Sequence, residues 1–159
     1  MWFYEDAPLG VTAEIGTQTV SAEEIVRFGR TYDPQPFHVD EAAARTSLYG
    51  GLIASGWQTA GLFMRTFVAY NERLSAAMAA RGEPVAKVGA SPGFEGLTWP
   101  RPVRPGDRLT FFSTPADKRP LASRPGWGLV MFDNAGRNQN DEPVLRFRSK
   151  VFIERRPER

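Results

Sequence analysis

The sequence predicts an α+β domain in which an antiparallel sheet wraps around one long helix. Two observations support this class. One long apolar helical segment lies in the first half of the chain, and the second half is a run of strand-like segments separated by Pro/Gly turns. The 159 residues suit one domain. We therefore expect a single domain over residues 1–159, with its core in about 10–153 and a solvated charged tail in 154–159.

An early strand and two short helices precede the long helix. Residues 11–20 alternate loosely between apolar and polar side chains, which is typical of a strand. Ser21 and Glu24 have the spacing of a capping box, so we expect a helix over 22–32. A second helix should cover 41–46.

The longest helical segment runs from Gly56 to about Ala80, with Ser55 as its N-cap. Apolar residues recur along it at steps of three and four, and its first half is apolar nearly all round. We expect such a helix to be buried on most of its sides.

Four strand-like segments follow, over residues 85–99, 107–114, 126–133 and 142–153. The last alternates with a period of two, which predicts one buried face and one wet face. The buried face would hold Leu145, Phe147, Val151 and Ile153, and the wet face Arg146, Arg148 and Lys150.

Composition excludes several classes of function. The net charge of +2 is too small to predict a nucleic-acid partner. The absence of cysteine excludes disulfides and thiolate nucleophiles. Arg65 interrupts the longest apolar stretch, over 62–68, which argues against a membrane span. The first residues lack the basic start and apolar run of a signal peptide, so we expect the cytoplasm.

The segment from Tyr32 to Asp40 contains the residues best suited to chemistry. Asp33 lies five residues before His38, the only histidine, and two prolines stiffen the loop between them. A carboxylate and an imidazole facing one small volume can share a water, one accepting its proton while the other orients it or donates. The same spacing also fits a histidine that only makes structural hydrogen bonds.

Gly56 opens the long helix, whose first amides are unpaired donors at the positive end of the helix dipole. Glycine lets a carbonyl approach the backbone closely, so the Gly56 amide could stabilise an oxyanion. The alternative is that Gly56 only permits close packing of the helix against the sheet.

Together these residues resemble the MaoC-like dehydratases, which include the R-specific enoyl-CoA hydratases. The first motif is Asp33-Pro34-Gln35-Pro36-Phe37-His38-Val39-Asp40, followed by Ser55-Gly56-Trp57. The second, Gly96–Leu109, is similar to the family's strand–turn–strand ending in Pro-Val-x-x-Gly-Asp-x-Leu. The resemblance spans about residues 10–153. It implies a hot-dog fold, a homodimer or dimer of dimers, and a tunnel for an acyl-CoA or acyl-carrier substrate.

By position, the resemblance implies catalytic roles for Asp33, His38 and Gly56. The implied reaction is reversible addition of water across a 2,3-double bond conjugated to a thioester. It needs no metal and no redox cofactor, because the thioester itself is the electron sink. The candidate substrate-binding residues are Ser55, Trp57, Phe37, Trp99 and Arg104.

The chain departs from the family pattern at four positions. Gln35 replaces an asparagine, and Phe37 replaces a smaller aliphatic residue. Ser55 replaces a histidine, and Met64 stands where the R-hydratases carry a serine. Two alternatives to the hydratase therefore stay open: a hot-dog acyl-CoA thioesterase, and a non-catalytic acyl-binding module. A thioesterase of this fold usually carries its acid on the long helix, where Glu72 is the only carboxylate and lies far from the helix start.

Overall fold

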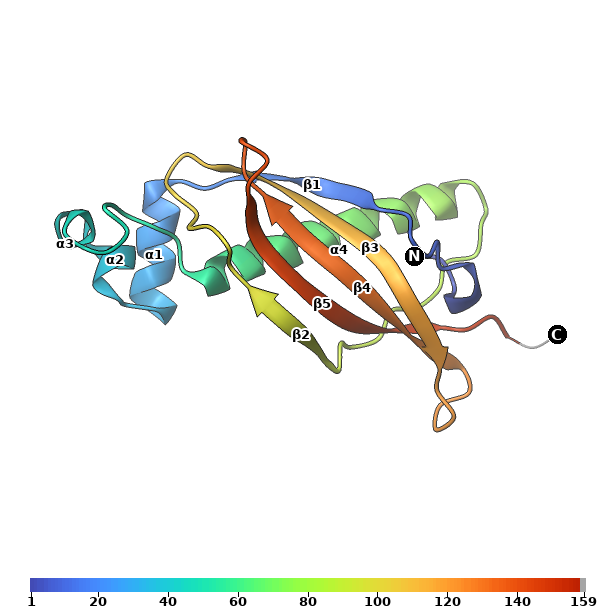
Figure 1. Ribbon diagram of the computed structural model, residues 1–159. Coiled ribbons are helices and arrows are strands. Elements are labelled where there is room, and N and C mark those ends of the chain that lie inside the picture. Colours follow the sequence, from blue (N-terminus) through green and yellow to red (C-terminus); the bar gives the residue numbers. More distant parts are fainter. Residues whose placement is uncertain (158–159) are drawn as a thin grey trace.

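The computed structural model describes residues 1–157 and is built around α4 (Gly56–Ala80), which lies across one face of a curved sheet (Figure 1). The five strands are β1 Ala13–Thr19, β2 Gly93–Thr98, β3 Arg108–Pro120, β4 Trp127–Arg137 and β5 Pro143–Glu154. They form one antiparallel sheet with the order β1-β3-β4-β5-β2. This architecture confirms the predicted α+β class.

The sheet is two-faced, as the sequence of β5 predicts. Leu145 is buried in the core with α4, and Val151 and Ile153 are buried in a second cluster that includes Phe3 and Tyr4, whereas Arg146 is exposed on the outer face. The alternation arises because successive strand residues point to opposite faces. The main core lies between the sheet, α4 and the short helices; its most buried members include Ile15, Ile25, Phe63, Leu109, Phe111 and Leu145.

Three of the predicted strands differ clearly in extent from those observed. Of the predicted strand over 85–99, Gly93–Thr98 forms β2, and Val88 makes an isolated bridge to Ile153. β4 continues to Arg137, past its predicted end at 133. β3 continues past its predicted end at Thr114, because Pro115 sits at a bulge, where a strand can accommodate a proline.

Three short helices gather beyond one end of the sheet, beside the start of α4 (Figure 1). They are α1 Ala22–Tyr32, α2 Pro36–Val39 and α3 Glu41–Arg45. The predicted capping box of α1 is confirmed, since the Ser21 and Glu24 side chains each accept from the other's backbone N–H. α2 lies in the segment for which the two prolines predict a stiff loop; its first residue is Pro36, and proline is well suited to the first turn of a helix.

The prediction that α4 is buried on most sides is wrong for this chain alone. The helix buries Thr59, Phe63 and Thr66 against its own sheet. On another side it exposes 56% of Trp57 and 49% of Met64. One sheet covers only one face of a helix, so the remaining apolar side chains have no cover within the chain.

The two ends of the chain meet, so the first residues of the predicted solvated tail pair with the N-terminal segment, although Arg156 stays exposed. A 3₁₀ turn, Tyr4–Asp6, provides carboxylates that pair with the C-terminal segment. Arg155 Nε lies 2.9 Å from Glu5 Oε1, and Arg156 Nη2 lies 2.7 Å from Asp6 Oδ2. The last two residues of the predicted tail, 158–159, lie outside the described residues.

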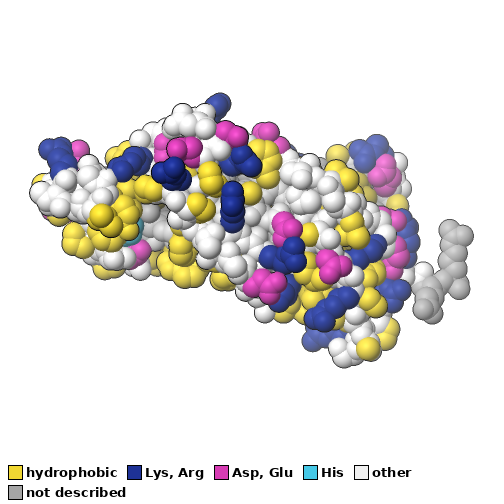
Figure 2. Space-filling model, viewed as in Figure 1, with side chains coloured by type: hydrophobic (Ala, Val, Ile, Leu, Met, Phe, Trp, Pro, Cys, Tyr) yellow, Lys and Arg dark blue, Asp and Glu magenta, His cyan; other side chains and the backbone are white. Residues whose placement is uncertain are grey.

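On the face shown in Figure 2, Lys and Arg side chains intermingle with Asp and Glu, as the small net charge leads one to expect. Within residues 1–157, none of the helices combines the length and apolar character that crossing a membrane requires.

Candidate active site

A pocket of about 510 Å³ opens at the amino end of α4, where α2, the segment before α4 and the segment after β2 converge. Its walls include Asp33, Phe37, His38, Tyr49, Ser55, Gly56, Trp57, Trp99 and Arg101. All but one of the sequence-predicted site residues therefore meet in one cavity.

The structure brings the predicted acid/base pair together. Asp33 ends α1, and His38 lies in α2, so the turn between the two helices aims both side chains at the pocket. His38 Nε2 lies 3.3 Å from Asp33 Oδ2. The imidazole is almost fully buried, whereas the carboxylate keeps about a fifth of its surface exposed.

A backbone contact sets the tautomer of His38. Its Nδ1 lies 2.7 Å from the carbonyl oxygen of Ile53, which can only accept a hydrogen bond, so Nδ1 carries a proton. In the neutral ring, Nε2 then has a free lone pair that faces the Asp33 carboxylate. A water in contact with both groups would find two acceptors for its protons, Nε2 of His38 and Oδ2 of Asp33.

Asp33 is held in its charged form. Burial raises the pKa of its carboxyl, but hydrogen bonds from Gln35 and Ser55 and the charge of His38 outweigh burial, so its pKa lies below the ordinary 3.8. Gln35 Nε2 donates to Asp33 Oδ1 at 2.9 Å, which leaves Oδ2 for His38. The longer side chain at position 35 thus reaches back to orient the carboxylate.

Ser55 has two tasks at the start of α4. Its Oγ accepts from the Trp57 amide at 3.2 Å, which confirms the predicted N-cap. The hydroxyl proton remains for Asp33, which explains the effect of Ser55 on the pKa of that carboxyl. The side chain is 1% exposed, so its geometry is fixed by packing.

Gly56 is the first residue of α4, and its amide has no acceptor within the helix. A Cβ placed on Gly56 would lie 2.5 Å from Cε2 of Trp99. Close packing therefore requires glycine here, whatever its amide binds. Gly56 also lines the pocket.

Two further residues shape the site without a clear sequence signal. Gly29 lets α2 approach α1, because an added Cβ would lie 2.9 Å from the His38 carbonyl oxygen. The Ile53 carbonyl orients the imidazole, and no side-chain pattern could reveal a backbone acceptor.

The predicted substrate-binding residues divide into two groups. Phe37, Trp57 and Trp99 line the pocket together with Ser55. Arg104 does not line it; its Nη2 donates to the Tyr49 carbonyl at 2.7 Å and supports the loop behind the pocket wall.

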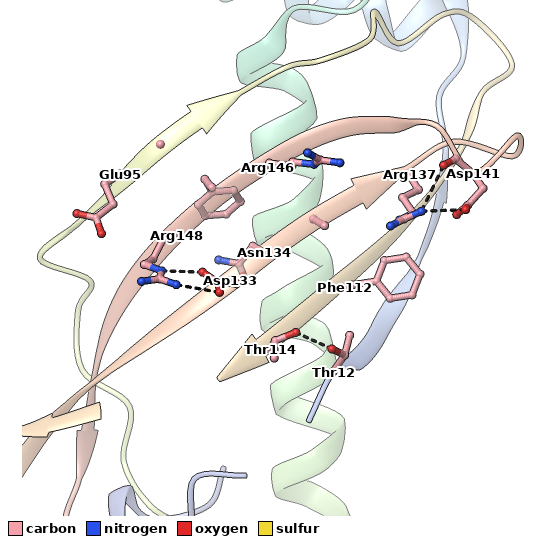
Figure 3. Close-up of a pocket in the computed structure, with 13 residues that line it drawn as sticks. Thr12, Glu95, Phe112, Thr114, Asp133, Asn134, Arg137, Asp141, Arg146 and Arg148 are labelled. Carbon is pink, nitrogen blue, oxygen red and sulfur yellow. Dashed lines mark hydrogen bonds and ion pairs between the residues drawn. The ribbon is translucent and has the colours of Figure 1, made fainter. Parts of the chain in front are cut away.

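A larger hollow, of about 780 Å³, lies elsewhere, on the outer face of the sheet (Figure 3). Most of its charged groups are paired: Arg148 binds both oxygens of Asp133 at 2.6 and 2.9 Å, and Arg137 binds Asp141 at 2.8 Å. Glu95 pairs with Lys150 outside the hollow. Arg146 alone has no ion-pair partner within residues 1–157. A single surface arginine does not make this hollow a reactive site.

Solved structures share the arrangement of a long helix on an antiparallel sheet. A MaoC-like dehydratase from Rhodospirillum rubrum is 39% identical, with a TM-score of 0.82 over 99% of this chain and 100% of that chain. The (R)-hydratase from A. caviae involved in PHA biosynthesis is 18% identical, with a TM-score of 0.65 over 96% of this chain and 99% of that chain, and shows the fold alone. The protein thus has the hot-dog fold of the MaoC-like dehydratases and R-hydratases.

Sequence comparison gives the family. Residues 8–124 match the family model described as "MaoC like domain", so the chain belongs to the MaoC-like domain family. A curated relative, "Uncharacterized protein YdeM" of Bacillus subtilis (strain 168), is 26% identical over 151 residues, which cover 95% of this chain and 98% of that protein.

Proposed function

We propose that this protein adds water to, or removes it from, the 2,3-double bond of an acyl thioester. The observation that supports this most directly is the His38 Nε2–Asp33 Oδ2 pair, 3.3 Å apart in a pocket at the amino end of α4. Membership of the MaoC-like domain family supports the same reaction class.

The positions of the protons on the pocket residues indicate a role for each group. A water contacts both His38 and the ionised Asp33. Because Nδ1 of His38 already carries its proton, Nε2 accepts the proton of the water. The water oxygen then bonds to C3 of the enoyl thioester while the carbon–carbon π pair moves toward C2 and the thioester carbonyl. Asp33 orients the water and stabilises the imidazolium.

The second half of the reaction uses the same imidazole. The Gly56 amide, at the positive end of α4, donates to the enolate-like oxygen. The proton on Nε2 of His38 then passes to C2, so the water contributes OH at C3 and H at C2. Asp33 has a lowered pKa and stays ionised, so it is not the proton donor in this scheme. The thioester is the electron sink, and the scheme uses no metal or redox cofactor.

A three-way assay tests the proposal. The purified protein is given enoyl thioesters of short and long chain, attached to CoA or to acyl carrier protein. We expect the conjugated thioester absorbance to disappear and a 3-hydroxyacyl thioester to form without release of free thiol. Free CoA in a thiol assay would instead identify a thioesterase. Saturable binding with no product would identify an acyl-binding module and contradict the proposal.

We also propose that the protein is a homodimer. Trp57, Met64 and Val68 leave an exposed apolar stripe on α4, and Phe94 is 54% exposed on the edge strand β2 beside it. A second copy would cover both the stripe and the open edge of the sheet. Sedimentation should show a dimer that Val68→Glu converts to monomer; a wild-type monomer would contradict the proposal.

A further inference from the structure

A third hollow, of about 350 Å³, lies between α4 and strands β2 and β5. Trp57 belongs both to its wall and to the wall of the candidate active site, so the two cavities adjoin. None of the residues that line it is charged; they are Trp57, Ala60, Phe63, Met64, Phe67, Ser91, Gly93, Phe94, Leu97, Phe147, Ser149 and Val151.

A polar network runs from buried Ser113 and Asn134 to partly buried Ser149 on the wall of this hollow. Asn134 Nδ2 donates to the Phe132 carbonyl at 3.2 Å, and because a carbonyl can only accept, this contact fixes which end of the amide is nitrogen. The other end, Oδ1, accepts from Ser113 Oγ at 2.8 Å. Nδ2 also donates to Ser149 Oγ at 2.9 Å. Ser149 is therefore an acceptor toward Asn134, and its own hydroxyl proton points elsewhere.

That proton has no acceptor among the described residues. Among the hydrogen bonds of residues 1–157, none has the Ser149 hydroxyl as donor. The other serine in the wall differs, because Ser91 Oγ donates to the Gly93 carbonyl at 3.1 Å. Ser149 is thus the available donor in a wall that is otherwise apolar.

The position of Ser149 indicates how far from the thioester an acceptor for its hydroxyl proton would lie. Ser149 pairs with Phe132 across the sheet, and the Phe132 ring contacts Phe67, eleven residues along α4 from Gly56. At about 1.5 Å per residue, this places Ser149 roughly 16 Å along the helix axis from the Gly56 amide. An extended chain of roughly a dozen bonds covers this distance.

We infer that this hollow takes the far end of the acyl chain, and that Ser149 donates a hydrogen bond to a neutral oxygen there. The inference rests on the proposed function. It makes the preferred substrate a medium-chain enoyl thioester with a hydroxyl or keto oxygen near its far end. A terminal carboxylate does not fit, since no cation lines the hollow to compensate a buried charge.

The test compares three enoyl-CoA esters of about twelve carbons: the plain chain, its ω-hydroxy derivative and its ω-carboxylate. We expect kcat/KM to be about tenfold higher for the ω-hydroxy ester than for the plain ester, and lowest for the carboxylate. Ser149→Ala should abolish the preference for the hydroxyl. Ser91→Ala should retain the preference, because that hydroxyl already donates to Gly93.

Three outcomes would overturn the inference. Wild-type protein could hydrate the plain and ω-hydroxy esters equally well. Ser149→Ala could lower the rates on both esters by the same factor, which would indicate a structural role. Ser149→Ala could also change the oligomeric state, which would indicate that a second copy fills the hollow. If no enoyl ester of any length is hydrated, the proposed function fails, and this inference fails with it.

Discussion

The pocket at the start of α4 and the hollow on the outer face of the sheet both contain a carboxylate whose pKa is lowered, but for different reasons. In the hollow, hydrogen bonds from the Arg148 guanidinium lower the pKa of Asp133. Both oxygens of Asp133 are bound to that one cation (Figure 3). In the pocket, burial opposes ionisation of Asp33, and neutral donors together with His38 overcome it.

This difference separates a structural charge from a reactive one. A carboxylate bound at both oxygens by arginine has its charge compensated and its lone pairs engaged. A carboxylate held by an amide at one oxygen keeps the other for an imidazole and a water. The larger cavity is the one whose carboxylate is bound at both oxygens by arginine, so cavity size is not the criterion that selects the candidate site.

The largest expected effect is the loss of activity when Asp33 is replaced, with Asp133 as the matched control. Asp33→Asn should lower kcat/KM for enoyl-CoA hydration by about 10³-fold, because the amide cannot stabilise the imidazolium. Asp133→Asn, an identical change in the outer hollow, should leave the rate unchanged. Steady-state kinetics of both variants measures this, with circular dichroism as the check on folding. Equal rates for Asp33→Asn and wild type would remove Asp33 from the mechanism.

The comparison extends to two glycines of α4. Gly56→Ala places a Cβ 2.5 Å from the Trp99 ring, which must move; we expect a loss of about 1–3 kcal/mol in unfolding free energy and a fall in activity of roughly tenfold. A Cβ at Gly61 would have no neighbour within 4 Å, so Gly61→Ala should stabilise the protein by up to about 1 kcal/mol. Urea unfolding and kinetics on both variants would distinguish the positions. If Gly56→Ala and Gly61→Ala changed stability and activity alike, Gly56 would be an ordinary helix residue.

Much of this arrangement could be predicted from the sequence because its signals are local. The N-cap at Ser55 and the alternation in β5 are each encoded within a few neighbouring residues. The pairing of Asp33 with His38 was predictable for the same reason, since only a stiff loop separates them.

What could not be predicted depends on contacts between distant segments. The carbonyl of Ile53 fixes the His38 tautomer from fifteen residues away. The exposed stripe of α4 depends on how many of its sides one sheet can cover. Arg104 resembled a ligand-binding residue, but its direction is set by the Tyr49 carbonyl, which sequence spacing does not reveal.

A smaller effect is expected at the two serine helix caps, where loss of stability can be distinguished from loss of activity. Ser55→Ala removes the cap of α4 and also the donor to Asp33. Ser21→Ala removes the matching cap of α1, away from the pocket. Each should cost about 1 kcal/mol of unfolding free energy. Only Ser55→Ala should also lower kcat, by several-fold, measured at a temperature where both variants are folded. An equal loss of kcat in the two variants would mean that Ser55 acts through helix stability alone.

The smallest expected effect is on the unfolding free energy at acid pH. Because the folded-state pKa of Asp33 lies below its ordinary value of 3.8, the ionised carboxylate stabilises the folded state. That contribution is fully present above the unfolded-state pKa and is lost as the pH falls through the folded-state pKa. The stability that wild type gains from this charge, relative to Asp33→Asn, should therefore decrease as the pH falls below about 4. Urea unfolding of both proteins at a series of acid pH values measures it. A difference in unfolding free energy that stays the same as the pH falls from about 5 to 2 would show that folding does not favour the ionised form of Asp33, and would remove the assumption that this carboxylate stays charged while His38 moves the proton.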